Sequence, residues 1–457
     1  MQDVLWITLE SVRQDRTSMG GHDRDTTPNI ADLAAKGASF DRCYSHDIWT
    51  RASSASILTG HASSAHRTWS NDASLPEAIT TIPETFQKAG YRTACVSPNP
   101  QLSVETGLAR GFDDFHYLAR ETLLNEVSLA DLSRWGINYR QHTGGLTADG
   151  AKHCLGYLEN QIAKGHIKDA ARNDESLFLY VHHGDTHHAY SPPVAWRETY
   201  IDEIEFSTKD ALRMALSMSS NIHEDIAAGL PYSEDEWDAL LAMYDATLAY
   251  VDQLVGDLVE YAQSQLQDPI IIITSDHGEA FGEDGLLAHM LAGNSAIANI
   301  PMVINGIKDL RGDGLIQHAD AMAMLCADLE IDATIPIGSD IREDERTFAV
   351  TQHGPERAEK KLEALLSHNS AFDVNRYPQG IVTDLWTEDW RYQQSGGQAK
   401  LFNLPDENIV DDQPEAAESL KSLVRSWMEE NGQPVGSTGA AEFGAEQEQR
   451  LRDLGYL

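Results

Sequence analysis

Short, nearly uninterrupted apolar runs recur along the chain and alternate with segments of helical period. The runs are DVLWITL, RTACVSP, SLFLYVHH, PIIIITSD and IPMVING, which begin at residues 3, 92, 176, 269 and 300. Runs without polar alternation are typical of strands that are buried on both faces, as in parallel sheets. The pattern therefore predicts an α/β fold with a central, mostly parallel sheet covered by helices on both faces.

Three helices are predicted between these runs, over residues 27–37, 74–90 and 234–264. The first begins with Thr27 and Pro28 and ends at Gly37, a common arrangement for helix ends. The second ends at Gly90. Apolar residues recur every three or four positions in the third, which predicts a long helix with one packing face.

The alternation of apolar runs with segments of helical period ends at about Gly338. Residues 1–338 are predicted to form the catalytic domain, and residues 339–432 a smaller C-terminal α+β subdomain of antiparallel strands and one amphipathic helix. Residues 433–457 are Gly-rich and acidic, which predicts a flexible tail. Residues 121–176 and 200–233 carry no readable motif and are interpreted as solvated, loop-containing insertions that shape the substrate pocket.

The chain is strongly acidic. It has 72 Asp and Glu against 34 Lys and Arg, a formal charge of −38. This charge argues against nucleic acid as a partner and suggests a halophilic protein in a salt-rich cytosol, because salt screens self-repulsion. An ordinary acidic enzyme is the alternative. We find no signal peptide and no apolar run of about 18 residues, so we expect a cytoplasmic protein without a transmembrane segment. Nothing in the sequence indicates an oligomeric state.

Acidic residues and histidines follow several of the predicted strands. Glu10 follows the first, and Asp276 and His277 follow the run PIIIIT. In parallel sheets, ligands gather at the carboxyl ends of strands. Carboxylate and imidazole groups together suit Mg²⁺, Ca²⁺, Mn²⁺ or Zn²⁺, and the sequence does not choose among these ions. The alternative for Glu10 is a carboxylate that caps the next turn.

The segment HDIWTRASSASILTG, residues 46–60, is rich in hydroxyl groups. It offers five candidate nucleophiles: Thr50, Ser53, Ser54, Ser56 and Thr59. A neighbouring metal would lower the pKa of such a hydroxyl and activate it. In the alternative interpretation the segment is a helix start that Thr50 or Ser53 caps. Since a helix N-terminus also binds anions, the two interpretations are compatible.

These pieces, in this order, resemble the sulfatase branch of the alkaline phosphatase superfamily. The segments that carry the resemblance are VLWITLES, TTPNIADLAAKGASF, WTRASSASILTG, FLYVHHGDTHHAYSPP, MYDATLAYVDQLVGDL, ITSDHGEAFGEDGLLAH and RLRDLGYL. The resemblance implies an alkaline-phosphatase-like fold. It places Thr50 at the nucleophile position, Asp276 and His277 on metal ligands, His187 on a substrate-contacting histidine, and His289 on the leaving group or substrate.

Departures from the family pattern bear on the chemistry. Sulfatases use a formylglycine made from Cys or Ser within C/S-x-P-x-R, whereas this chain has Thr50, Ala52 and Ser54 at the three defining positions. We therefore expect no formylglycine. Glu10 stands in place of the usual aspartate, and Ser11 in place of a second acidic residue that sulfatases often carry, which favours one metal ion over two.

The resemblance and its departures together predict a mechanism. One divalent ion is bound by Glu10, Thr50, Asp276 and His277. Thr50 attacks phosphorus and forms a covalent ester. His289 or His187 protonates or hydrogen-bonds the leaving oxygen. Arg51 is a candidate clamp for a substrate oxygen, with an exposed surface arginine as the alternative.

The predicted activity is that of a sulfatase-like hydrolase or transferase that cleaves phosphate esters, including diesters. The substrate is then an anionic ester, either a small molecule or one linked to a glycan or lipid. Hydrolysis of sulfuric esters without formylglycine is the first alternative. A relative that binds an anionic ester or a partner without turnover is the second, suggested by Ala52 and Ser54.

Overall fold

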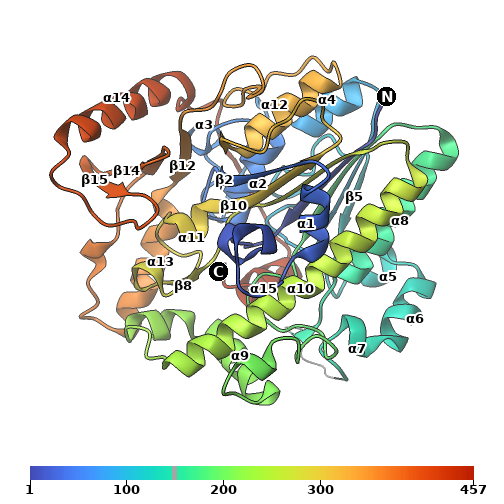
Figure 1. Ribbon diagram of the computed structural model, residues 1–457, viewed down its shortest axis with the longest axis horizontal. Coiled ribbons are helices and arrows are strands. Elements are labelled where there is room, and N and C mark those ends of the chain that lie inside the picture. Colours follow the sequence, from blue (N-terminus) through green and yellow to red (C-terminus); the bar gives the residue numbers. More distant parts are fainter. Residues whose placement is uncertain (147–151, 457) are drawn as a thin grey trace.

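The computed structural model describes residues 1–146 and 152–456. An eight-stranded sheet runs through its centre in the order β11-β2-β10-β7-β1-β6-β4-β5 (Figure 1). The strands are β1 (Val4–Leu9), β2 (Ala38–Tyr44), β4 (Arg92–Ser97), β5 (Asp114–Tyr117), β6 (Leu177–His183), β7 (Ile270–Ser275), β10 (Asn299–Asn305) and β11 (Leu315–Ile316). All five predicted apolar runs form strands of this sheet. β1 pairs in parallel with β6 and β7, and β10 is antiparallel to both β7 and β2.

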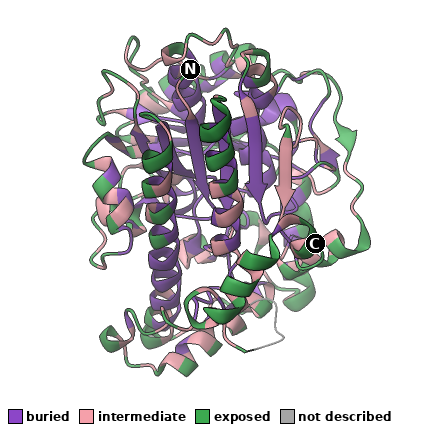
Figure 2. Ribbon diagram, turned by 90° about the vertical axis from the view of Figure 1, so that its right-hand side faces the viewer, coloured by how far each residue is buried: buried purple, intermediate pink, exposed green. Residues whose placement is uncertain are grey.

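Side chains alternate between two cores, one on each face of the sheet. In β1, Val4 and Trp6 point into one core, and Leu5, Ile7 and Leu9 into the other. The helices that cover the first face are α2 (Thr50–Thr59), α4 (Ile82–Lys88) and α12 (His318–Asp328). Those on the second face are α1 (Pro28–Ala34), α8 (Gly156–Asn173) and α10 (Glu234–Gln265). Figure 2 shows the central strands buried beneath helices whose outer surfaces are exposed. The predicted fold class is confirmed.

A second, antiparallel sheet follows in the order β12-β13-β14-β15. Its strands are β12 (Ala349–His353), β13 (Val382–Trp386), β14 (Trp390–Ser395) and β15 (Gln398–Asn403). Helix α14 (Pro414–Asn431) packs on this sheet through Leu420 and Val424. Helix α13 (Pro355–His368) instead packs beside α9 (Thr208–Ala227). The smaller α+β unit is thus confirmed, while its boundary at residue 338 stays a prediction.

The structure corrects two expectations about secondary structure and shows which helices form in the two regions without readable motifs. The predicted helix over 74–90 is only α4, because Thr81 and Glu84 form a capping box that starts the helix there. The region 200–233 contains the long helix α9 between irregular segments. The region 121–176 contains α5 (Leu123–Glu126), α6 (Leu129–Ile137), α7 (Tyr139–His142) and α8, while its residues 147–151 lie outside the described residues.

The second correction concerns the segment after residue 433, for which the sequence predicts a flexible tail. Its strand β16 (Gly439–Ala440) pairs with β3 (Ala73–Ser74), and helix α15 (Ala445–Asp453) follows. Leu451 and Tyr456 pack in one cluster with Trp49 and Trp69. Apolar burial therefore holds the segment against the main domain, and only Leu457 of the expected tail is not described.

The remaining short elements are α3 (Ser63–His66), α11 (Ser295–Ala298), and the hairpin of β8 (Ala280–Phe281) and β9 (Leu287–Ala288). Among the described helices, none has the length and apolar character needed to cross a membrane.

Candidate active site

The carboxyl ends of three neighbouring parallel strands meet at one edge of the central sheet. Leu9 of β1 is in register with His183 of β6 and Ser275 of β7. The residues that follow, Glu10 and Asp276, are therefore brought together although 266 positions separate them in the sequence. Both carboxylates are buried.

Glu10, His182 and Asp276 form a compact set of candidate metal ligands. One ligand atom from each lies within 4.8 Å of the others. The Oδ1 atom of Asp276 accepts hydrogen bonds from the backbone N–H groups of Ser11 (3.1 Å) and His277 (2.9 Å). In the described part of the chain, Asp276 Oδ2 and both ring nitrogens of His182 have no hydrogen-bond partner. Buried lone pairs without partners are costly, so this donor set fits a divalent cation.

His182 is not among the metal ligands that the sequence predicts. The only local signal for it is its place at the carboxyl end of an apolar strand. His277, a predicted ligand, also faces this region: its Nε2 atom lies 3.4 Å from Asp276 Oδ2. Its Nδ1 donates to the carbonyl oxygen of Gly278 at 2.9 Å, which leaves the Nε2 lone pair free to bind a cation.

Thr50 is the first residue of α2 and is buried beside these groups. Its Oγ1 lies 3.2 Å from Glu10 Oε1 and 3.3 Å from His277 Nε2. The N-cap residue is Trp49, which makes no side-chain cap, so the expected capping by Thr50 or Ser53 is wrong. The Thr50 hydroxyl is thereby free to meet Glu10 and His277.

Three of the other four hydroxyls of the segment have partners elsewhere, and Ser54 Oγ is buried without a hydrogen-bond partner in the described part of the chain. Ser53 donates to the carbonyl oxygen of Asp276 at 2.6 Å, and Thr59 donates to the carbonyl oxygen of Ala55 at 2.7 Å. Ser56 contacts His66 at 3.0 Å. Thr50 is the hydroxyl of this segment that meets the candidate metal ligands.

Two further predicted residues, His187 and His289, lie across from Thr50. Their ring centroids are 5.2 Å apart, and the His289 ring is 4.3 Å from that of His277. His187 Nδ1 donates to the carbonyl oxygen of His188 at 2.7 Å, which leaves Nε2 as an acceptor. Burial, together with the charges of His277 and Arg357, holds the pKa of His289 well below its usual range. Neutral imidazoles here can accept a proton.

Arg51 is fully buried, so the expected alternative of an exposed arginine is wrong. Its Nε donates to Gln101 Oε1 at 2.6 Å, and its Nη1 donates to the carbonyl oxygens of Ser70, Asn71 and Ala73 at 2.8–2.9 Å. These bonds join the start of α2 to the 70–73 segment. A substrate clamp at Arg51 stays a prediction, beside this observed structural role.

Besides His182, two residues that touch the site are not predicted from the sequence, Asn99 and Tyr456. The Tyr456 hydroxyl lies 2.8 Å from Thr50 Oγ1 and donates to Glu10 Oε1 at 2.9 Å. Asn99 Nδ2 donates to the same Glu10 oxygen and, at 3.2 Å, to the Tyr456 hydroxyl. The C-terminal segment RLRDLGYL resembles the family, but no local feature of this segment assigns a role to Tyr456.

The charged and hydrogen-bonding groups around Glu10 keep its carboxylate ionised. Burial alone would raise the pKa of this carboxyl, but the charges of His187 and His182 and the Tyr456 hydrogen bond outweigh it and lower that pKa to about 2. An ionised carboxylate is what a cation ligand requires.

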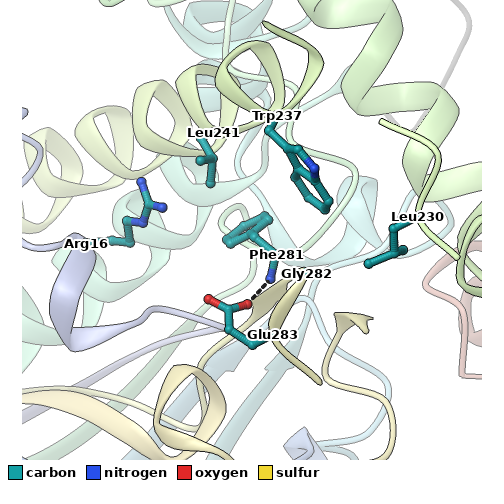
Figure 3. A pocket seen from close by; sticks show the side chains of 7 residues that line it. All are labelled: Arg16, Leu230, Trp237, Leu241, Phe281, Gly282 and Glu283. Atoms are coloured by element: carbon teal, nitrogen blue, oxygen red, sulfur yellow. Dashed lines mark hydrogen bonds between the residues drawn. The ribbon is translucent and has the colours of Figure 1, made fainter. Parts of the chain in front are cut away.

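An open pocket of about 390 Å³ lies away from these groups (Figure 3). Its walls include Trp237 from α10, Phe281 from β8 and Glu283 from the turn between β8 and β9. None of the predicted site residues lines it. Thr50 itself is closed off in this conformation, with the Tyr456 side chain against it.

The sulfatase family model matches residues 2–325 of the chain, the part that carries all the predicted site residues. The chain belongs to the sulfatase family. Members of this family are typically metal dependent, in agreement with the Glu10, His182 and Asp276 set.

Two curated members of the sulfatase family illustrate the relationship. The chain is 25% identical to the sulfatase YidJ of Escherichia coli K12 over 68% of its own length and 64% of that protein. It is also 25% identical to the choline-sulfatase of Rhizobium meliloti over 66% of its own length and 62% of that protein. The match thus spans slightly less than two thirds of each relative.

Solved structures extend the similarity to nearly the whole chain of this sulfatase-family protein. The phosphonate monoester hydrolase of Agrobacterium radiobacter superposes with a TM-score of 0.72, covering 94% of this chain and 96% of that one at 18% identity. At this identity the comparison establishes that the two proteins share a fold.

Proposed function

We propose that this sulfatase-family protein is a metal-dependent hydrolase or transferase that cleaves phosphate esters, including diesters, through a covalent intermediate on Thr50. One observation carries the proposal: the Thr50 hydroxyl, at the N-terminus of a helix, lies in hydrogen-bond contact with both Glu10 and His277. A nucleophile is expected where a hydroxyl meets a cation site and an anion-binding helix end.

The residues that would hold the cation are Glu10, Thr50, Asp276 and His277, with His182 beside them. A bound divalent ion lowers the pKa of a coordinated hydroxyl and neutralises charge on an ester oxygen. The donor set of carboxylates and imidazole is compatible with Mn²⁺, Mg²⁺, Ca²⁺ or Zn²⁺.

The side chains around Thr50 supply the proton transfers. Thr50 Oγ1 attacks phosphorus, and the backbone N–H groups at the start of α2 attract the anionic ester. In the first step His187 or His289 takes the proton that leaves Thr50 Oγ1 and passes it to the leaving oxygen as the bond from phosphorus to that oxygen breaks. In the second step the same imidazole takes the proton of the attacking water or acceptor alcohol.

The identity of the nucleophile favours phosphate over sulfate esters. A formylglycine hydrate expels sulfate by elimination, whereas a threonine ester has no such route and must be cleaved by attack at phosphorus or sulfur. Sulfate-ester hydrolysis is the second candidate, because the curated relatives are named as sulfatases, one of them a choline-sulfatase. An anionic ester, either a small molecule or one borne by a glycan or lipid, is the proposed substrate class.

Mass spectrometry of the intact protein tests the proposal. The protein is mixed with p-nitrophenyl phosphate, bis-p-nitrophenyl phosphate or p-nitrophenyl sulfate, each with Mn²⁺, Mg²⁺, Ca²⁺ or Zn²⁺. We expect release of nitrophenol and a phosphoryl adduct that maps to Thr50 and is absent in Thr50→Ala. Thr59→Ala, which removes a hydroxyl from the same helix, should retain both. No turnover of any ester, or equal turnover by Thr50→Ala, overturns the proposal.

A further inference from the structure

Tyr456 places a phenol hydroxyl directly against the proposed nucleophile. Its oxygen lies 2.8 Å from Thr50 Oγ1, 2.9 Å from Glu10 Oε1 and 3.2 Å from Asn99 Nδ2. Tyr456 is 2% exposed, and its ring centroid is 5.6 Å from that of His187 and 6.1 Å from that of His289. The hydroxyl therefore lies among the groups that would carry out the chemistry.

Several independent contacts fix this position. Asn71 Nδ2 donates to the carbonyl oxygen of Tyr456 at 2.6 Å, and Lys361 Nζ donates to the carbonyl oxygen of Gly455 at 2.6 Å. Gly455 has φ +74°, and a Cβ there would come within 3.4 Å of the His188 ring. Leu451 of α15 anchors the preceding helix in a cluster with Trp49. The backbone around Tyr456 is held at several points, so its side chain is suited to act in a fixed geometry.

The direction of the hydrogen bond between Thr50 and Tyr456 determines what this contact can do in the reaction. In the free site either hydroxyl of the Thr50–Tyr456 pair can donate. Once Thr50 is esterified, its Oγ1 has no hydrogen and can only accept, so Tyr456 becomes the donor of the pair by turning its single hydrogen from Glu10 Oε1 to Thr50 Oγ1.

A threonine ester needs such a donor more than a formylglycine ester does. When water attacks phosphorus, the new P–O bond forms as the bond from phosphorus to Thr50 Oγ1 breaks. The electron pair goes to Thr50 Oγ1, and the proton from water goes to Nε2 of His187 or His289, from which it returns to Thr50. Alkoxides are poor leaving groups, and a hydrogen bond that strengthens as negative charge develops lowers this barrier.

We propose that Tyr456 is a catalytic residue that stabilises the Thr50 oxygen as the leaving group when the covalent threonine ester is cleaved. This inference rests on the proposed function. It predicts that the loss of the phenol hydroxyl slows the second step more than the first, so that the covalent ester accumulates.

The test compares Tyr456→Phe, which keeps the ring, with wild type and with Tyr91→Phe. Tyr91 is also buried, and its hydroxyl donates one hydrogen bond, to the carbonyl oxygen of Gln2. The full-length protein with Mn²⁺ is mixed rapidly with bis-p-nitrophenyl phosphate, and nitrophenol release and intact mass are followed. For Tyr456→Phe we expect a burst of about one equivalent, a steady-state rate about 10- to 100-fold below wild type, and a phosphoryl adduct on Thr50 during turnover. Tyr91→Phe should match wild type.

Asn71→Ala provides a second variant, because it retains the hydroxyl but releases the backbone carbonyl that positions it. A smaller loss in the same step is expected. Thermal unfolding of each variant establishes that it is folded at the assay temperature.

The outcomes separate the two proposals. If wild type and Tyr456→Phe turn over at equal rates without an adduct, or if Tyr456→Phe is faster, Tyr456 only covers the site and the inference is overturned. If wild type releases no nitrophenol and forms no adduct, the proposed function falls and the inference falls with it.

Discussion

Thr50 Oγ1 lies 3.3 Å from Nε2 of His277, a residue 227 positions away in the sequence. The contact exists because α2 begins directly above the carboxyl ends of β1 and β7, so that a helix N-terminus faces two strand-end side chains. A hydroxyl, an imidazole lone pair and the Glu10 carboxylate thus converge without local sequence proximity.

Replacing Asp276 by Asn should weaken cation binding by at least about tenfold, because Oδ2 loses its negative charge while Oδ1 can still accept its backbone bonds. Wild type should gain about 2.7 kcal/mol of unfolding free energy at a Mn²⁺ concentration 100 times the dissociation constant. Thermal unfolding with increasing Mn²⁺ measures this gain. Glu388→Gln, a change at an exposed carboxylate, should leave it intact. An equal gain in Asp276→Asn would exclude this carboxylate as a ligand.

Arg51→Met should lower the free energy of unfolding by about 3 kcal/mol. The substitution leaves buried acceptors on Gln101 and on residues 70–73 without a hydrogen-bond donor. Urea denaturation measures the change. The KM for p-nitrophenyl phosphate should stay close to the wild-type value if Arg51 only positions α2. A large rise in KM with stability unchanged would instead support the substrate clamp.

Lys361 should make stability depend on pH between about 7 and 10. Burial, with the charge of Arg357 added, lowers the pKa of this ammonium to about 7 in the folded protein. Unfolded lysine titrates near 10.4, so between these values the unfolded chain binds a proton that the folded chain does not. Stability therefore rises with pH over this range, by up to about 1.4 kcal/mol per pH unit.

Urea denaturation of wild type and Lys361→Met from pH 7 to 9 measures this contribution. The slope of unfolding free energy against pH should be more positive in wild type. Identical slopes would mean that Lys361 titrates normally in the folded protein. The comparison uses slopes, because Met also loses the hydrogen bond to Gly455.

Salt should stabilise the protein. With a formal charge of −38, the folded state suffers repulsion that is largely screened once the Debye length falls to about 3 Å near 1 M salt. We expect the melting temperature to rise between 0.1 and about 1 M KCl. A sucrose series of equal osmolarity is the control for solute exclusion. A melting temperature that KCl does not raise beyond sucrose would support an ordinary acidic protein.

Several parts of the site followed from the sequence, because strand-end chemistry is locally encoded. Charged groups placed directly after continuous apolar runs marked Glu10 and Asp276, and the parallel sheet then brought them together. The family resemblance singled out Thr50 among five hydroxyls. The structure gives that residue, and none of the other four, contacts with both Glu10 and His277.

At Arg51, tertiary contacts outweigh the usual preference of a charged side chain for the surface. A charged side chain is usually exposed, so the sequence favoured the surface. Burial is tolerated here because the guanidinium meets four acceptors, three of them backbone carbonyls between residues 70 and 73. Carbonyl positions depend on the path of the chain, which residue types do not reveal.

The sequence by itself determined the α/β class, the order of the buried strands and the residues at their carboxyl ends, because hydrophobic periodicity reports directly on burial. Only the tertiary structure decided that His182 faces Glu10, that a long helix α9 forms within residues 200–233 and that Tyr456 meets Thr50. The Tyr456 contact with Glu10 spans 446 positions and follows a Gly-rich acidic stretch. Such a contact depends on where apolar anchors such as Leu451 dock, which is a property of the assembled core rather than of any local pattern.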